Sequence, residues 1–313
     1  MRRETWGRKP ASPWARMAGA IGLLAMGVAL GHAPADGAET TKTVRLLTVG
    51  NSFARNATRY LPEFAKAAGC ELVLVGANPG GCSMERHWTN AALHEADPAK
   101  GLLYKDRQGR PASLKALLRS EPFDFVTIQQ VSTQSFQPDS YRPYARNLYD
   151  YIRKHAPQAE ILLHQTWAYR VDHKLFGTTS LTQPLMHAGL KGAYDSMAAE
   201  LGCRIIPVGD AFERARANPR WGRPPARIRG NDAVTTASAP RDWGLNTADA
   251  RHANAAGCYL GAAVFMEVLF DRDVRDISYA PGELAPEDAA FLREVAHQAA
   301  ADRRRRSGKE DAP

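Results

Sequence analysis

The sequence has few cysteines, no internal repeat and no long apolar run, and each lack excludes a class of protein. Its 313 residues include four cysteines, none of them in a C-x-x-C pair, which argues against a zinc site or thioredoxin-like chemistry. Disulfides and free buried thiols both stay open. No change of composition marks a second folded domain.

Positive charge is concentrated at the two ends of the chain rather than in its body. Of the formal net charge of +8, residues 1–35 hold +4 and residues 302–313 hold +2, which leaves +2 for the body. A body with so small an excess of positive charge does not show the basic patch that is typical of a nucleic-acid-binding protein. We therefore expect no nucleic-acid partner. We interpret residues 301–313 as a disordered charged tail.

The N-terminal apolar run is too short to span a bilayer, which takes about 20 residues. It covers residues 17–30, follows five basic residues, and precedes small residues at Ala33, Ala35 and Ala38. This order is typical of a secretory signal peptide. We expect residues 1–38 to be a signal peptide and short leader, and the protein to be exported, periplasmic or extracellular, with no stable membrane anchor.

Strand-like and helix-like segments alternate along residues 39–300, which we expect to form one domain. Apolar runs predict five strands, and helical periodicity predicts helices between them and at 252–269. Such strands are typical of a parallel sheet covered on both faces. The prediction is an α/β fold, a three-layer α/β/α sandwich with a central five-stranded, mostly parallel sheet. The strands are expected at 44–49, 72–75, 123–128, 161–163 and 204–208.

Three segments interrupt this alternation. Residues 85–113 contain a polar hairpin or excursion near 104–110, residues 168–184 are rich in aromatic and polar groups, and residues 216–246 are rich in proline and arginine. Long loops in compact domains are usually functional or disordered. We expect these segments to help shape a substrate cleft.

The first strand runs directly into Gly50-Asn51-Ser52, where a helical pattern begins. A serine there is commonly a helix N-cap, but this corner of an α/β protein is also where ligands bind. Asp249 and His252 stand just before the last predicted helix. The Asp can accept a hydrogen bond from one ring nitrogen while the other nitrogen takes a proton from a hydroxyl. Ser52 is therefore a candidate nucleophile.

Two further segments offer oxyanion donors at the same edge of the sheet. Gly81 follows the second strand, where its backbone N–H is unobstructed by a side chain. Gln129 and Gln130 end the third strand. A hydroxyl, a base with its orienting carboxylate, and amide donors are the groups that acyl transfer needs.

In these motifs the sequence resembles the SGNH/GDSL hydrolase superfamily, over about residues 44–270. Gly50-Asn51-Ser52-Phe53 stands where the family has Gly-Asp-Ser, Gly80 or Gly81 matches its glycine block, and Asp249-x-x-His252 matches its final block. Gln129-Gln130 stands where most members have Gly-x-Asn-Asp, which is the main departure. The GNSF, GGCS-x-x-x-HW and QQ segments are similar to those of a poorly characterised secreted branch.

The resemblance implies a flavodoxin-like SGNH hydrolase fold over residues 39–300, with Ser52 as nucleophile, His252 as general base and then acid, and Asp249 as its orienter. The oxyanion donors would be the backbone N–H groups of Ser52 and Gly81 and one side-chain amide. Because side chains alternate along a strand, only one of the two glutamines can face the site. We favour Gln130, which lies nearer the carboxyl end.

Candidate substrate contacts follow the glycine block and the fourth strand. Trp and Tyr offer flat faces suited to sugar rings, although ordinary core aromatics are an alternative. Asp172 and His173 have no third ligand at recognisable spacing, so we expect no metal and no cofactor. The candidate substrate-binding residues are His87, Trp88, Trp167 and Tyr169.

Together these features predict an exported serine esterase that removes O-acetyl or other short acyl groups from carbohydrate, with a glycan or small-molecule ester as substrate. A lipase or thioesterase of the same superfamily remains an alternative. So does a non-catalytic glycan-binding protein with a degenerate oxyanion hole.

Overall fold

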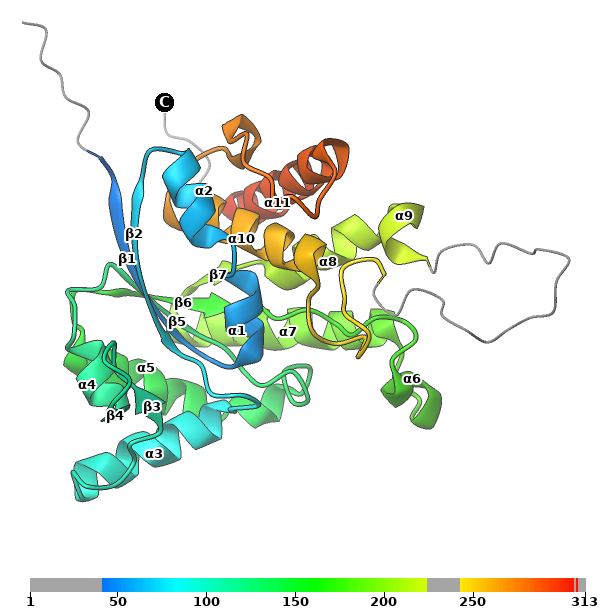
Figure 1. Cartoon of the computed structure of the whole chain (residues 1–313). Coiled ribbons are helices and arrows are strands. Elements are labelled where there is room, and N and C mark those ends of the chain that lie inside the picture. Colours follow the sequence, from blue (N-terminus) through cyan, green and yellow to red (C-terminus); the bar gives the residue numbers. More distant parts are fainter. Residues whose placement is uncertain (1–40, 224–242, 307, 309–313) are drawn as a thin grey trace, which may run out of the picture. The chain divides into compact units, whose positions relative to one another are not determined.

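The computed structural model describes residues 41–223, 243–306 and 308, which belong to one compact unit (Figure 1). The predicted signal peptide and leader lie outside the described residues, as does most of the proline- and arginine-rich segment at 216–246. Within the described part of the chain, no helix is both long enough and apolar enough to cross a membrane.

Five parallel strands form the central sheet, in the order β2-β1-β5-β6-β7. This is the flavodoxin-like strand order, in which ligands bind at the carboxyl ends where the order reverses. The predicted sheet is confirmed, although its last strand ends at Ile206 because α8 begins at Val208. The strands are β1 (Thr43–Val49), β2 (Glu71–Ala77), β5 (Phe125–Ile128), β6 (Glu160–His164) and β7 (Arg204–Ile206).

Helices cover both faces of the sheet (Figure 1). Helices α2, α10 and α11 lie on one face, and α3, α4 and α5 lie on the other. The α-helices are α1 (Ser52–Ala57), α2 (Leu61–Ala67), α3 (Met84–Ala96), α4 (Leu114–Leu118), α5 (Tyr144–His155), α6 (Lys174–Thr178), α7 (Gln183–Leu201), α8 (Val208–Arg216), α9 (Pro219–Gly222), α10 (Ala255–Leu269) and α11 (Pro286–Arg306). The 3₁₀ helices are η1 (Pro138–Tyr141) and η2 (Val274–Asp276).

Helix α10 is the centre of its layer. Nearly all of its side chains are buried, because it packs against α1, α2, α8 and α11 as well as facing the sheet. A helix that is apolar all round needs such surroundings. It begins three residues later than predicted, so Asp249 and His252 lie in the turn before it.

Outside the sheet, the structure corrects one sequence prediction and confirms another. Residues 301–306 form the end of α11 and not a disordered tail, because arginines are favoured at a helix C-terminus and Arg303 pairs with Asp195 and Asp210. Within residues 85–113 the expected hairpin is present as β3 (Tyr104–Lys105) and β4 (Pro111–Ala112), but it follows helix α3. All four cysteines are free.

Candidate active site

Ser52 lies at the first position of α1, directly after the carboxyl end of β1. The helix is capped by Asn51, whose Oδ1 accepts a hydrogen bond of 3.0 Å from the backbone N–H of Phe53. Asn51, and not Ser52, is therefore the cap. The Ser52 hydroxyl instead contacts His252, with 2.8 Å between Ser52 Oγ and His252 Nε2.

Asp249 fixes the orientation of His252 on the far side of the ring. The distance from His252 Nδ1 to Asp249 Oδ2 is 2.5 Å, and Asp249 Oδ1 accepts the backbone N–H groups of Arg251 and His252. Partial burial alone raises the pKa of Asp249, but these hydrogen bonds, led by that of His252, outweigh it and hold the pKa well below its usual range. An ionised carboxylate keeps the proton on Nδ1 and leaves Nε2 to accept the Ser52 proton.

The turn that carries Asp249 and His252 has an unusual backbone. Ala250 adopts a left-handed conformation with φ of +57°, which is rare for a residue other than glycine and costs about 1 kcal/mol or more. Its carbonyl accepts the N–H of Arg170 at 2.8 Å, and the next carbonyl, of Arg251, accepts Trp167 Nε1 at 2.9 Å. These contacts hold the turn in place.

The glycine loop, residues 79–82, lies against the turn that leads into Ser52. Asn51 Nδ2 donates to the carbonyl of Cys82 at 3.0 Å, and Gly81, with φ of +62°, sits in the turn closed by Cys82 N–H and Pro79 O. The first N–H groups of a helix have no partner within the helix. The N–H groups of Ser52 and Gly81 stay the predicted oxyanion donors.

Residues 45–219 match the model of a protein family described as a domain of unknown function, DUF4886. The chain belongs to the DUF4886 family. It is similar to the crystal structure of a DUF4886 family protein from Bacteroides uniformis, with 27% identity and a TM-score of 0.68 over 82% of this chain and 95% of that one. That similarity and the strand order agree on the fold.

Other solved structures similar to this DUF4886 chain include SGNH hydrolase and GDSL-like lipase folds. One, from Slackia heliotrinireducens, is described as "a putative SGNH hydrolase", with 24% identity and a TM-score of 0.47 over 72% of this chain and 98% of that one. No curated protein matches the chain.

The prediction that Gln130 completes the oxyanion hole of this DUF4886 protein is contradicted by the hydrogen bonds of its side chain. Gln130 is fully buried, and its Nε2 donates to the carbonyl and hydroxyl oxygens of Ser140 at 2.7 and 3.3 Å. An amide NH₂ has two protons, so none is left for a substrate. Gln130 does follow the carboxyl end of β5, as predicted, but its side chain turns toward the neighbouring loops.

The side-chain amide of Gln129 is also engaged, in a buried series of hydrogen bonds behind Ser52. His164 Nδ1 donates to Gln129 Oε1 at 2.7 Å, and Gln129 Nε2 donates to Asn51 Oδ1 at 2.9 Å. Burial lowers the pKa of His164 to about 3, so the ring is neutral. The series of hydrogen bonds continues through Asn51 to the carbonyl of Cys82. It connects the carboxyl ends of β5 and β6 to the glycine loop.

The predicted substrate contacts prove to be packing or positioning residues. His87 is buried, with Nε2 donating to the carbonyl of Gly50 at 2.9 Å and Nδ1 accepting from Tyr104 at 2.7 Å, and burial lowers its pKa to about 4. His87 thus supports the turn that leads into Ser52. Trp88 is partly buried against α5, where it meets Tyr151 edge-on.

The two aromatics after β6 are also inside the protein. Trp167 is fully buried and stacks between Phe53 and Phe212 at 4.2 and 4.5 Å. Tyr169 is 2% exposed, and its hydroxyl lies 3.0 Å from Ser132 Oγ. Neither presents a free face to a sugar. The sequence located both near the site, but periodicity after the strand end could not show that they point inward.

A candidate metal group lies away from the triad. Glu267, Asp273 and His297 place ligand atoms within 4.8 Å of one another. The two carboxylates already form ion pairs with arginines, because Arg304 contacts Glu267 and Arg275 contacts Asp273. His297 Nδ1 also lies 2.9 Å from Glu267. Asp172, considered with His173 at the sequence level, is paired with Arg170.

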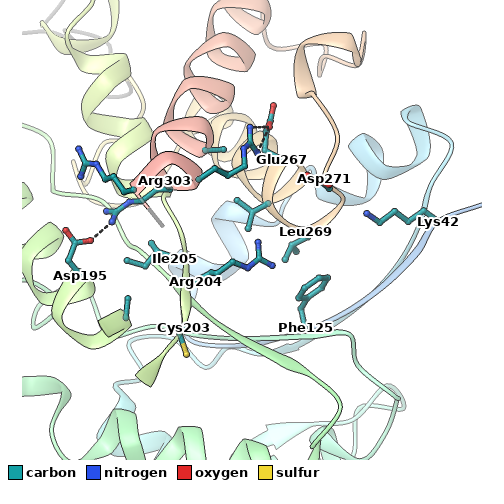
Figure 2. Close-up of a pocket in the computed structure, with 15 residues that line it drawn as sticks. Lys42, Phe125, Asp195, Cys203, Arg204, Ile205, Glu267, Leu269, Asp271 and Arg303 are labelled. Atoms are coloured by element: carbon teal, nitrogen blue, oxygen red, sulfur yellow. Dashed lines mark hydrogen bonds and ion pairs between the residues drawn. The ribbon is translucent and has the colours of Figure 1, made fainter. Parts of the chain in front are cut away.

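A cavity of about 680 Å³ lies at the edge of the sheet opposite to Ser52 (Figure 2). Lys42, Phe125 and Arg204 line it at the amino ends of β1, β5 and β7. The seven residues of β1 span about 20 Å at ~3.3 Å per residue. The cavity is therefore separate from the triad, and ion pairs such as that of Arg303 with Asp195 cross its wall.

We expect Asn51→Asp to lower both stability and turnover, although aspartate is the residue that the resembled family has there. Asp removes the N–H that Asn51 donates to Cys82 and turns a buried carboxylate toward that carbonyl. Losing such a buried bond costs about 1–3 kcal/mol. Urea unfolding should show this loss, and kcat should fall because the Gly81 loop is released.

Asn147→Asp is the matched control, because it makes the same chemical change at a partly exposed position of α5. It should leave the free energy of unfolding within about 0.5 kcal/mol of the parent. Equal stability of Asn51→Asp and the parent would show that the Asn51–Cys82 bond does not hold the loop.

Proposed function

We propose that the protein is an ester hydrolase that works through a Ser52–His252–Asp249 acyl-enzyme mechanism. One observation carries the proposal: the hydroxyl, both ring nitrogens and the carboxylate form one continuous line of hydrogen bonds of 2.8 and 2.5 Å. The line lies at the carboxyl edge of a parallel sheet, where α/β proteins bind ligands. Each group has the partner that its role requires.

The chemistry follows from this order of groups. Ser52 Oγ attacks the ester carbonyl carbon while His252 Nε2 takes the hydroxyl proton, and backbone N–H groups stabilise the oxyanion. The intermediate collapses, the bond to the alkoxide breaks, and His252 returns its proton to the leaving oxygen. Water then attacks the acyl-serine with His252 again as base, which releases the carboxylic acid and restores Ser52.

We propose short acyl esters of carbohydrate as the substrates and export as the route to them. The resemblance to SGNH hydrolases supports the short ester, and the N-terminal sequence pattern supports export. The side chains of His87, Trp88, Trp167 and Tyr169 do not support a sugar as substrate, because they are packed inside or against the core. The glycan therefore rests on the resemblance.

Covalent labelling with a fluorophosphonate tests the mechanism. The reagent should modify the parent once, at Ser52, and should not modify Ser52→Ala. Hydrolysis of p-nitrophenyl esters should fall steeply from acetate to octanoate. A flat or rising series would instead support a lipase or thioesterase, whereas glycan binding without labelling or turnover would support a non-catalytic protein.

A further inference from the structure

Asn246 lies behind the turn that carries Asp249 and His252. It is fully buried, and both its side-chain oxygen and its side-chain nitrogen are engaged in hydrogen bonds. Its Nδ2 donates to the carbonyl oxygens of Arg251 and His252 at 3.2 and 3.4 Å. The carbonyl of Arg251 also accepts Trp167 Nε1. The amide thus holds the backbone on which His252 stands.

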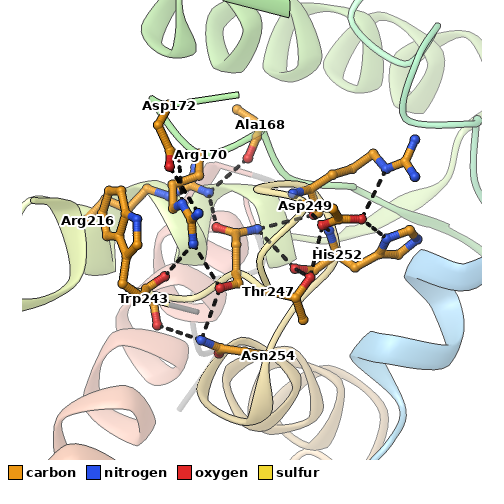
Figure 3. A network of polar contacts seen from close by, with 12 residues as sticks. Ala168, Arg170, Asp172, Arg216, Trp243, Thr247, Asp249, His252 and Asn254 are labelled. Carbon is orange, nitrogen blue, oxygen red and sulfur yellow. Dashed lines mark hydrogen bonds and ion pairs between the residues drawn. The ribbon is translucent and has the colours of Figure 1, made fainter. Parts of the chain in front are cut away.

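Two buried arginines fix Asn246 from the other side. Arg216 Nη2 donates to Asn246 Oδ1 at 3.0 Å and to the carbonyl of Ala168 at 2.9 Å. Arg170 Nη1 donates to the backbone carbonyl of Asn246 at 3.0 Å, while its Nε and Nη2 pair with Asp172 (Figure 3). Burial lowers the pKa of Arg216 to about 10, so it stays charged at neutral pH.

The strained turn explains the effect of this network, by which we mean the hydrogen bonds of Asn246, Arg170 and Arg216. Left-handed Ala250 stores strain between Asp249 and His252, and such strain persists only where the surroundings over-determine the backbone. The restraints come from both sides: Arg170 N–H holds the Ala250 carbonyl, and Asn246 holds the next two. Thr247 N–H also donates to the His252 carbonyl, at 2.9 Å. Without the two Asn246 bonds the turn is held less tightly, and we expect the 2.8 Å contact between His252 and Ser52 to lengthen.

We propose that Asn246 is a positioning residue, which acts through the carbonyls of Arg251 and His252 to hold the imidazole against Ser52. This inference rests on the proposed esterase function for its kinetic consequence only. The restraint on the backbone of residues 247–252 does not depend on that function. It goes beyond the Ser-His-Asp mechanism by naming the group that keeps the base in line.

The test is Asn246→Asp, which keeps the acceptor for Arg216 and removes the donor to the two carbonyls. Arg216, which already lies 3.7 Å from Glu213, gains a second carboxylate partner that offsets part of the lost hydrogen bonds, so the fold should survive with a modestly lower melting temperature. We expect kcat, counted per site labelled by fluorophosphonate, to fall about 10–100-fold with KM nearly unchanged. Losses of that size are typical where a residue that orients a metal-ligating histidine is removed, and we expect a similar effect on an oriented base.

Ala250→Gly is the second variant. Glycine adopts the left-handed backbone freely, so the variant removes the strain and leaves every hydrogen bond of the network in place. It should keep the stability of the parent and most of its kcat, because Asn246 still restrains the turn. Combined with Asn246→Asp, it should restore part of the lost kcat, because the strain that drives the unrestrained turn to relax is gone. A double variant no more active than Asn246→Asp alone would overturn the proposal, since Asn246 would then not act by holding this strained turn.

Hydrogen exchange separates this inference from the proposed function. In Asn246→Asp the amides of Arg251 and His252, which donate to Asp249, should exchange at least about tenfold faster, while those of β1 and β5 stay unchanged. This readout holds even if the parent hydrolyses no ester. Unchanged exchange at residues 247–252, or an active parent whose kcat survives Asn246→Asp, would overturn the proposal.

Discussion

Replacing Ser52 by alanine is expected to lower kcat for ester hydrolysis about 10⁶-fold, the loss typical of removing the nucleophile of a serine hydrolase. The reason is geometric. His252 Nε2 lies 2.8 Å from this one hydroxyl, so the variant has a base and no group to deprotonate. About 10³–10⁴-fold acceleration over water should persist, because the oxyanion donors remain. Burst kinetics with p-nitrophenyl acetate measures the loss.

Ser113→Ala serves as the control for this variant. Ser113, like Ser52, stands at the start of a helix, although it is buried, and its Oγ caps α4 by accepting the N–H of Ala116. Its loss should cost about 1 kcal/mol of stability and leave kcat unchanged. If Ser52→Ala keeps more than about 1% of parental activity while folded, Ser52 is not the nucleophile.

The sheet could be predicted because its strands are continuous apolar runs, which few other structures accommodate. Helix α11 could not, although it buries one whole side. Its buried residues are mostly alanines such as Ala289, Ala296 and Ala299, set among charged side chains. Alanine gives little hydrophobic contrast, and the arginines that follow resemble a solvated tail. Tertiary contacts, including those of Arg303, decide that segment.

The site divides in the same way. Ser52, Asp249 and His252 could be found because their residue types, spacing and places at element boundaries suit one chemistry. Gln130 failed because a strand end gives the edge of the sheet and not the partner that an amide will choose, here Ser140. Asn246 gave no signal, since it lies in an aperiodic segment and acts through backbone carbonyls alone.

Asp249→Asn is expected to lower kcat about 10⁴-fold while the turn keeps its shape. The amide oxygen can still accept the N–H groups of Arg251 and His252, as Asp249 Oδ1 does now. Its NH₂ group, however, would face His252 Nδ1 as a donor. The ring then holds its proton on Nε2, facing Ser52, and cannot act as the base.

The same substitution predicts a change in acid sensitivity. Hydrogen bonds hold the folded-state pKa of Asp249 below its unfolded value, so the stability it contributes is present above the unfolded pKa of about 3.9 and is lost as pH falls toward the folded value. Asparagine does not titrate. The parent should therefore lose more unfolding free energy than Asp249→Asn between pH 5 and about 2.

Asp150→Asn on α5 is the matched control, since that exposed carboxylate meets only Arg146 at 3.7 Å among the described residues. It should change neither kcat nor the acid limb of urea unfolding. A kcat for Asp249→Asn within about tenfold of the parent would mean that His252 reaches the needed tautomer without the carboxylate. The restraint by Asn246, Trp167 and Arg170 would then be sufficient to orient the base, and Asp249 would serve the turn more than the proton.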